Sequence, residues 1–247
     1  MVFQLPQFVT AATVVAAAVL LAGCGPSDES DRLTNPGPLS GPFYVSDHFA
    51  PSGHMGDGEV AGYITALVGE EALEARRTWC AGALSSGAPV TDGCPERPPG
   101  AGGDPYVFIW DPGPQMWMGV YWVYPANNWG RVPGRALDPN YRYTKARFWA
   151  ATDTPGTFWE FFIGGIKNPT FPYQDKISLP HKVSALSHDY TQFEITIPPQ
   201  IYEVEGRQID TLLGGFGIAT NLPASTPAAE VPGKPPRAIF LDDIVWE

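Results

Sequence analysis

Short apolar stretches separated by clusters of Pro, Gly and Asp dominate the hydrophobic pattern of this 247-residue chain. Apolar runs of this length, bounded by such clusters, are typical of β-strands. The clusters at 111–114, 153–156 and 198–199 are strong turn signals, and residues 70–77 alone carry a helical pattern. The expected strands span residues 62–68, 106–110, 117–124, 146–151, 157–166, 193–197, 212–219 and 238–246.

This order of elements predicts an all-β protein. Because helical stretches do not alternate with the strands, a parallel sheet is not expected. We predict a jelly-roll β-sandwich of two antiparallel sheets, with one short helix and long loops. The composition agrees, since Gly and Pro occur 27 times each and charged residues make up only 17%. Many turns produce such a profile, whereas long surface helices do not.

The stretch 117–129 is the most aromatic part of the pattern. Alternation along a strand places Met118, Val120, Trp122 and Tyr124 on one face, and Trp117, Tyr121 and Val123 on the other. Both faces are apolar or aromatic. The strand is therefore expected either at the centre of a two-layer sandwich or with one face in the core and the other toward a ligand.

The net charge excludes one class of partner. Lys and Arg together number 15 and Asp and Glu 26, which gives −11. Binding to nucleic acid requires a basic surface that neutralises phosphates, so nucleic acid is not an expected partner. Neutral ligands and cations remain open.

The first 23 residues carry no charged side chain and include the apolar run 9–21. This run is too short to span a bilayer, so it predicts a signal peptide. Its end, Leu-Ala-Gly-Cys at 21–24, resembles the lipobox of bacterial lipoproteins. The resemblance implies cleavage before Cys24, acylation of Cys24, and anchoring in the cell envelope, at the outer membrane or cell surface, since Gly25 follows where Asp would retain the protein. The alternative is an ordinary signal peptide or membrane anchor.

The mature chain is expected to have two parts. Residues 24–41 are rich in Pro, Ser, Gly and Asp and predict a flexible tether, followed by one sandwich domain over 42–247. With Cys24 acylated, Cys80 and Cys94 remain, and two spare thiols in an exported chain predict a disulfide. A reactive or metal-binding cysteine is the alternative, although no Cys-x-x-Cys motif occurs.

The two ends of this domain carry motif-like sequences. The closing stretch 239–246 has aromatic and aliphatic residues around Asp242 and Asp243, and the opening stretch 43–58 includes Asp47-His48-Phe49. Together they resemble the last and first strands of galactose-binding-like jelly rolls, notably carbohydrate-binding modules. The resemblance implies that the first and last strands lie side by side. It also implies a structural Ca²⁺ held by Asp47, Asp242 and Asp243.

Other roles for the two adjacent carboxylates stay open. One of them can be solvated while the other accepts hydrogen bonds from backbone N–H groups or from an arginine. Asp57 and Glu59 are further candidate ligands, because hard oxygen donors suit Ca²⁺.

Aromatic side chains on a sheet can stack on the apolar faces of sugar rings, while amide and charged groups bond to the hydroxyls. The sequence predicts such a site from Trp117, Tyr124, Asn127, Asn128, Trp129 and Arg131. Trp129 is the leading candidate, because core packing explains an aromatic residue in a loop less readily than one in a strand. The competing interpretation is that these residues are core, as most buried Trp and Tyr are.

Known catalytic motifs are missing from the chain: it has no Gly-x-Ser-x-Gly, His-Glu-x-x-His, P-loop or Gly-x-Gly-x-x-Gly sequence. We therefore expect a surface lipoprotein with a non-catalytic carbohydrate-binding domain, whose partner is a glycan. One alternative is a glycoside hydrolase on the same scaffold, with acids such as Glu160, Glu203 and Glu205. The other is a structural or interaction lipoprotein without a small ligand.

Overall fold

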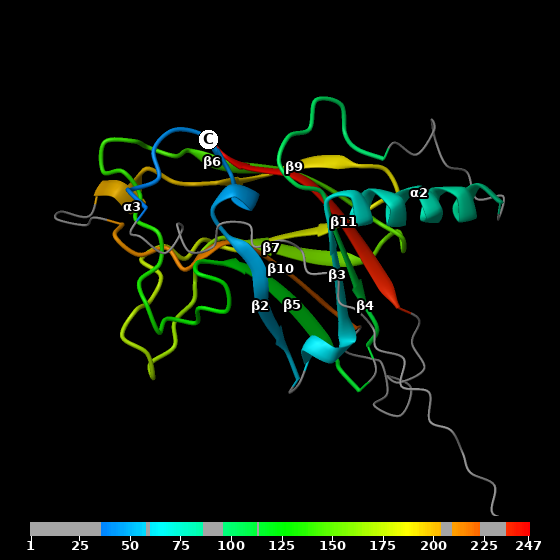
Figure 1. Cartoon of the computed structure of the whole chain (residues 1–247), viewed down its shortest axis with the longest axis horizontal. Coiled ribbons are helices and arrows are strands. Elements are labelled where there is room, and N and C mark those ends of the chain that lie inside the picture. Colours follow the sequence, from blue (N-terminus) through cyan, green and yellow to red (C-terminus); the bar gives the residue numbers. More distant parts are fainter. Residues whose placement is uncertain (1–35, 58–59, 86–95, 113, 204–208, 223–235) are drawn as a thin grey trace, which may run out of the picture. The chain divides into compact units, whose positions relative to one another are not determined.

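The apolar stretches form two antiparallel sheets in the computed structural model, which describes residues 36–57, 60–85, 96–112, 114–203, 209–222 and 236–247 (Figure 1). Sheet 1 has the order β3-β4-β11-β6-β9, with β1 also paired to β11. Its strands are β1 (Phe43–Tyr44), β3 (Ile64–Val68), β4 (Tyr106–Trp110), β6 (Lys145–Thr152), β9 (Thr191–Thr196) and β11 (Arg237–Trp246).

Sheet 2 has the order β2-β5-β10-β7-β8, again with antiparallel neighbours throughout. Its strands are β2 (Ala50–Gly56), β5 (Trp117–Val123), β7 (Phe158–Phe162), β8 (Lys182–Ala185) and β10 (Gly214–Asn221). The helical elements are η1 (Val45–Asp47), η2 (Val60–Tyr63), α2 (Glu70–Ser85) and α3 (Gln200–Glu203). The predicted β-sandwich of two antiparallel sheets is confirmed.

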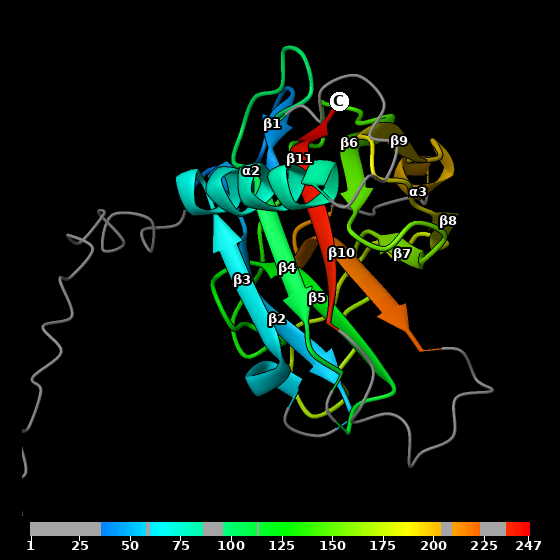
Figure 2. The same ribbon diagram turned by 90° about the vertical axis from the view of Figure 1, so that its right-hand side faces the viewer.

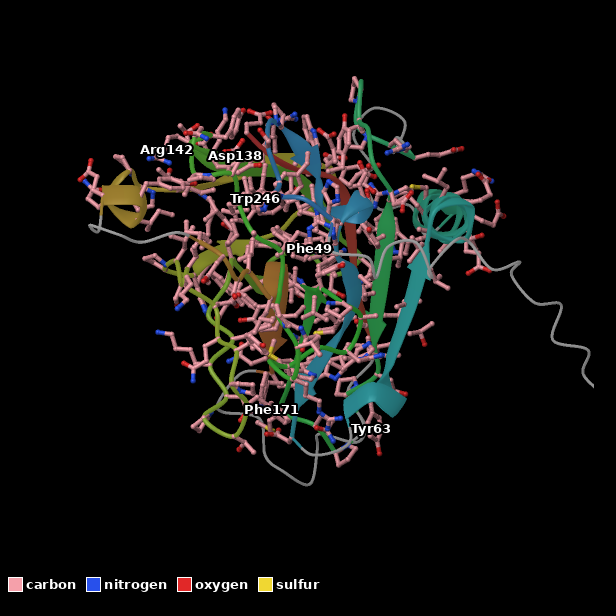
Figure 3. The ribbon with its side chains drawn as sticks, turned by 60° about the vertical axis from the view of Figure 1, so that its left-hand side comes forward. Phe49, Tyr63, Asp138, Arg142, Phe171 and Trp246 are labelled. Carbon is pink, nitrogen blue, oxygen red and sulfur yellow. The ribbon has the colours of Figure 1, made fainter. Side chains whose placement is uncertain are left out.

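The core lies between the facing sides of the two sheets. Its largest members include four tryptophans without appreciable exposure, Trp110, Trp122, Trp159 and Trp246. The indole N–H of Trp246 donates to the carbonyl oxygen of Gly215 at 3.0 Å, which links the last strand of sheet 1 to β10 of sheet 2. Trp246 and Phe49 are both buried in this interior (Figure 3).

The first and last strands are neighbours, as expected. Phe43 pairs with Trp246 and Tyr44 with Val245, and the rings of Phe43 and Trp246 stack with centroids 5.5 Å apart. Residues Pro36–Glu247 form one compact unit. Within the described ranges, no helix is both long and apolar enough to cross a membrane.

Some elements differ from the expectation. The helix runs over Glu70–Ser85, beyond the predicted 70–77. Strands β2 and β8 were not predicted. In β2 the reason is that Pro51 and Gly53 are residue types typical of a turn. Both strands lie at edges of sheet 2, where a proline without an N–H group is tolerated, and the β2–β5 register shifts between these two residues.

The outer faces of the two sheets are covered differently. Helix α2 packs on sheet 1, where Ala72 and Trp79 meet apolar side chains of β4 and β11 (Figure 2). On sheet 2, Trp129, Ile166 and Leu213 cover the end of β5 near Val123. Toward the opposite end of β5, the face of sheet 2 is hollowed.

Candidate functional site

A groove of about 380 Å³ lies on the outer face of sheet 2, and we call it the outer groove. It crosses β2, β5, β10 and β7 and reaches the start of β8, so residues distant in sequence share it. Its lining residues are Met55, Trp117, Tyr121, Glu160, Phe162, His181, Ala219, Thr220 and Asn221.

The hollow arises from small residues on its central strands. Alternation turns Gly119 of β5, and Gly217 and Ala219 of β10, toward the outer face, and register places Ala219 opposite Gly119. A Cβ on Gly217 would lie 1.9 Å from the ring of Phe162, so the glycine lets that ring lie against β10. Small residues in the middle and large ones at the sides make a floor with raised walls.

A row of rings crosses the sheet along this floor. Tyr121 meets Trp129 on one side and Phe162 on the other, with centroids 5.9 and 4.8 Å apart, and Phe162 stacks on the His181 ring at 4.6 Å. The Tyr121 hydroxyl donates to the carbonyl oxygen of Gly164 at 2.9 Å, and burial raises its pKa, so it remains a donor at neutral pH. These contacts hold the floor rigid.

One wall of the groove is polar. The carboxylate of Glu160 lies 2.8 Å from Nδ1 of His181, and both side chains are about half exposed. This pair can offer hydrogen-bond donors and acceptors to a ligand in the groove. Asn221, on the exposed end of β10, adds an amide.

Two exposed apolar side chains lie on the same face of sheet 2, next to residues that line the groove. Phe158 and Val183 are 61% and 56% exposed, the highest values among large hydrophobic residues in the described part of the chain. Both point to the outer face, since Phe158 alternates with Glu160 and Val183 pairs with Glu160. Continuing the β10–β7 register by two residues puts Phe158 beside Asn221.

Trp117 lies across β10 from Phe158. It pairs with Asn221 across β5 and β10, so Trp117, Asn221 and Phe158 form one row on three adjacent strands. Two strand spacings place Trp117 and Phe158 about 10 Å apart. The indole N–H of Trp117 donates to Asp57 at 2.8 Å, while the other carboxylate oxygen of Asp57 accepts from the Met116 N–H at 2.9 Å. The orientation of the Trp117 ring is thereby set.

Comparisons with known proteins give a likeness in fold. The structure is similar to the family 11 carbohydrate-binding module from Clostridium thermocellum in complex with a β-1,3-1,4-mixed-linked tetrasaccharide (TM-score 0.37, 9% identity, 84% of this chain and 96% of that chain). It is also similar to TmCBM61 in complex with β-1,4-galactotriose (TM-score 0.34, 10% identity, 87% and 96% coverage). No protein-family model and no curated protein sequence matches the chain.

The structure separates the predicted sugar-binding residues. Of the six, Trp117 lines the outer groove, whereas the other five lie on or near the loop that follows β5. Trp129 is half-buried and packs on Tyr121, so it extends the floor from outside the lining. Tyr124 packs against the core beside Phe49.

The amide pair of this loop has a local role. Asn128 is buried, and its side chain bonds to the backbone of Tyr124, Gly130 and Val132, which shapes the turn. Asn127 is exposed with a left-handed backbone (φ 60°), and its N–H donates to the Ser52 hydroxyl at 2.8 Å.

Arg131 lies apart from the outer groove as well. Its side chain is exposed, and its guanidinium carbon lies 5.2 Å from the ring centroid of Phe171, a loop residue labelled in Figure 3.

Two of the three predicted calcium ligands, Asp242 and Asp243, form ion pairs with arginines. Asp242 is fully buried and accepts hydrogen bonds from Arg97 at 2.5 and 2.7 Å, and Asp243 accepts from Arg147 at 2.7 Å. Asp47 is exposed, and its carboxylate accepts a hydrogen bond from Ser46. Among the described residues, no three His, Cys, Asp or Glu side chains group closely enough to hold a metal ion. This arrangement does not fit the calcium site, and calcium binding itself stays an untested prediction.

Further predictions concern residues outside the described ranges. Cys24 and the signal sequence lie in residues 1–35, and Cys94 lies in residues 86–95. Lipidation and the disulfide of Cys80, which is buried in α2, therefore stay predictions. Of the candidate acids, Glu203 lies exposed on α3, and Glu205 is outside the described residues.

The sequence did not reveal Phe158 and Val183 as exposed neighbours of the groove. Phe158 stands in an apolar run in which alternate residues Trp159 and Phe161 enter the core. The signal that could have exposed it is Glu160, two positions along, which marks that face of the strand as solvent-accessible.

Proposed function

We propose that this protein is a non-catalytic carbohydrate-binding β-sandwich, exported and anchored to the cell envelope through acylated Cys24, and that the outer groove binds a neutral glycan. The observation that carries the proposal is the row Trp117–Asn221–Phe158, in which Trp117 and Asn221 line the groove and Phe158 lies beside it by strand register. Aromatic side chains on strands about 10 Å apart can stack on the sugars of one glycan chain, and the amide between them can bond to the hydroxyls.

The character of the remaining lining supports a polar, uncharged ligand. Exposed apolar side chains beside Glu160 and His181 give the mixture of apolar surface and few polar groups that is usual in ligand sites. Glu160 and the nearby Asp57 are acidic, so a polyanionic glycan would be repelled at this groove. The rigid ring row beneath lowers the conformational entropy that a ligand must remove on binding.

Glycoside hydrolysis is the second candidate function, and Glu160 is the observation that favours it. A glycosidase needs two acids about 5–9.5 Å apart across the scissile bond. Glu160 is the one carboxylate among the described groove-lining residues, and its described partner is His181. Assays with soluble glucans, galactans and mannans decide the question: product release that disappears in Glu160→Gln would establish hydrolysis.

Affinity electrophoresis in gels containing neutral β-glucan, β-galactan or β-mannan tests the binding proposal. For the retarding polysaccharide, calorimetry with its oligosaccharides then gives the dissociation constant. We expect Trp117→Ala and Phe158→Ala each to weaken binding by about 3- to 10-fold, the equivalent of roughly 1 kcal/mol per lost ring contact.

The chain offers matched controls for these variants. Trp149 is half-buried on β6 of sheet 1, so Trp149→Ala removes a comparable ring from the other sheet. In the same way, Val68→Ala on β3 matches Val183→Ala beside the groove, since both valines are exposed. Equal effects at the matched positions, or no retardation by any of the polysaccharides, would rule out the outer groove as a glycan site.

A further inference from the structure

A second cleft, larger than the outer groove, is formed by loops beside sheet 2. Its volume is about 610 Å³, and we call it the lysine cleft. It lies between the segment 167–178, residues 210–211 and the start of α3. The lining residues are Lys167, Pro172, Tyr173, Gln174, Asp175, Lys176, Ile177, Ser178, Ile201, Asp210 and Thr211.

Lysines are concentrated in this segment of an otherwise acidic chain, and two of them, Lys167 and Lys176, line the cleft together with two aspartates, Asp175 and Asp210. The sequence has five lysines, and Lys167, Lys176 and Lys182 fall within sixteen residues that include one acidic residue, Asp175. Within the described part of the chain, neither Lys167 nor Lys176 forms an ion pair, whereas Lys145 on sheet 1 pairs with two glutamates. Both cleft lysines are exposed, so their ammonium groups can meet a ligand.

The backbone of the cleft is fixed, although most of it is neither helix nor strand. Buried Asp175 accepts hydrogen bonds from the N–H groups of Ile166 at 2.8 Å, Leu213 at 2.5 Å and Gly214 at 3.3 Å. Its own N–H donates to the Ile166 carbonyl, and the Lys176 N–H donates to the Thr211 carbonyl. The carboxylate is thus used inside the loop, and it ties both walls of the cleft to sheet 2.

Burying a carboxylate in this way costs free energy, because the charged form loses its hydration. A loop held in one shape at such a cost, with two lysines on its rim, has the preorganisation of a binding site. The hydroxyls of Ser178 and Thr211 and the amide of Gln174 add neutral hydrogen-bonding groups. Tyr173 and Ile201 add apolar surface.

We propose that the lysine cleft is a second ligand site, separate from the outer groove, that binds an acidic saccharide through Lys167 and Lys176. The ammonium groups bond to carboxylates on the sugar, while the amide and hydroxyl groups of the cleft bond to its neutral hydroxyls. Asp210, exposed on the same cleft, opposes the anion.

Calorimetric titration of the full-length protein with α-1,4-trigalacturonate, at low salt, tests this proposal. The fully methyl-esterified trisaccharide serves as the uncharged counterpart. We expect the acid to bind and the ester not to bind, and added NaCl to weaken the binding because the contacts are exposed charges. Lys167→Gln and Lys176→Gln should each weaken binding by about fivefold or more, while Asp210→Asn should strengthen it.

Two further variants separate this site from others. Lys182→Gln removes a lysine from the same segment outside the cleft and should leave trigalacturonate affinity unchanged. Trp117→Ala alters the outer groove and should also leave it unchanged, whether or not that groove binds a neutral glycan. The proposal is overturned if the wild type does not bind the acid, if the ester binds equally well, or if the two lysine variants retain the wild-type affinity; loss of affinity in the Trp117 variant alone would place the acid in the outer groove instead.

Discussion

The buried ion pair between Arg97 and Asp242 allows a stability prediction worked from the structure. Asp242 has no exposed surface and lies on β11, where its carboxylate accepts two hydrogen bonds from the Arg97 guanidinium at 2.5 and 2.7 Å. Arg97 also donates to the carbonyl oxygens of Gly102 and Gly103, at 3.3 and 3.1 Å. Arg97→Ala therefore leaves a buried carboxylate without its cation and frees the loop that leads into β4.

The magnitude follows from the geometry. Removing one partner of a buried ion pair destabilises a protein by about 3–5 kcal/mol, because the remaining charge stays buried and unpaired. The Arg97 side chain is 32% exposed, so water can reach the vacated position. We therefore expect the low end, about 3 kcal/mol. For a domain of this size, with a slope of about 2–3 kcal/mol per M urea, the unfolding midpoint should fall by roughly 1–1.5 M.

The assay is urea unfolding followed by tryptophan fluorescence, with Arg77→Ala as the matched control. Arg77 lies on α2 and pairs with Glu70, Glu74 and Glu96, but all four side chains are at least 36% exposed. Exposed ion pairs contribute little, since water screens them. The urea midpoint of the Arg77 variant should therefore lie much closer to that of the wild type, although this variant loses more ion pairs.

The pH dependence provides a separate check. Burial raises the pKa of Asp242, while the hydrogen bonds and charge of Arg97 oppose that shift. In Arg97→Ala the interactions that oppose this shift are absent. The pKa of the Asp242 carboxyl in the folded state therefore rises further above its value in the unfolded state. Stability then falls as pH rises, and the deficit of the variant should be larger at pH 8 than at pH 5. A deficit equal to that of Arg77→Ala, or independent of pH, would refute this reasoning.

Two other predictions concern the floor of the outer groove and the loop of the lysine cleft. Gly217→Ala should lower the free energy of unfolding by about 1–3 kcal/mol, because its Cβ would lie 1.9 Å from the Phe162 ring. Gly62→Ala is the control, since a Cβ there would have nothing within 4 Å. Equal urea midpoints for the two variants would contradict the packing argument. Burial raises the pKa of Asp175 to about 7, although three backbone N–H donors lower it. The folded state therefore binds more protons than the unfolded state between about pH 4 and 7, so the stability that this group contributes falls as pH rises. In Asp175→Asn that fall should be missing, and a wild-type advantage over the variant that grows from pH 5 to pH 8 would show that the N–H donors outweigh burial.

The local sequence was sufficient for most of the strands. The predicted run 106–110 coincides with β4, and alternation correctly separated Met118, Val120 and Trp122 from Trp117 and Tyr121 on opposite faces, although it did not say which face is the core. These assignments succeed because side-chain direction in a strand depends only on the position of each residue along it. The pairing of the first and last strands followed from their resemblance to known terminal strands.

Which residues of different strands meet at the groove depended on information that no local pattern contains. Trp117 faces Asn221 and Phe158 only because β10 lies between β5 and β7 in one register, and a shift by one residue would turn each side chain to the core. The hydrogen-bond partner of the buried Asp242 carboxylate is likewise Arg97, which is 145 residues away in the chain. Strand order, register and the distant partners of buried charges are properties of the assembled sheets, so only the tertiary structure could reveal them.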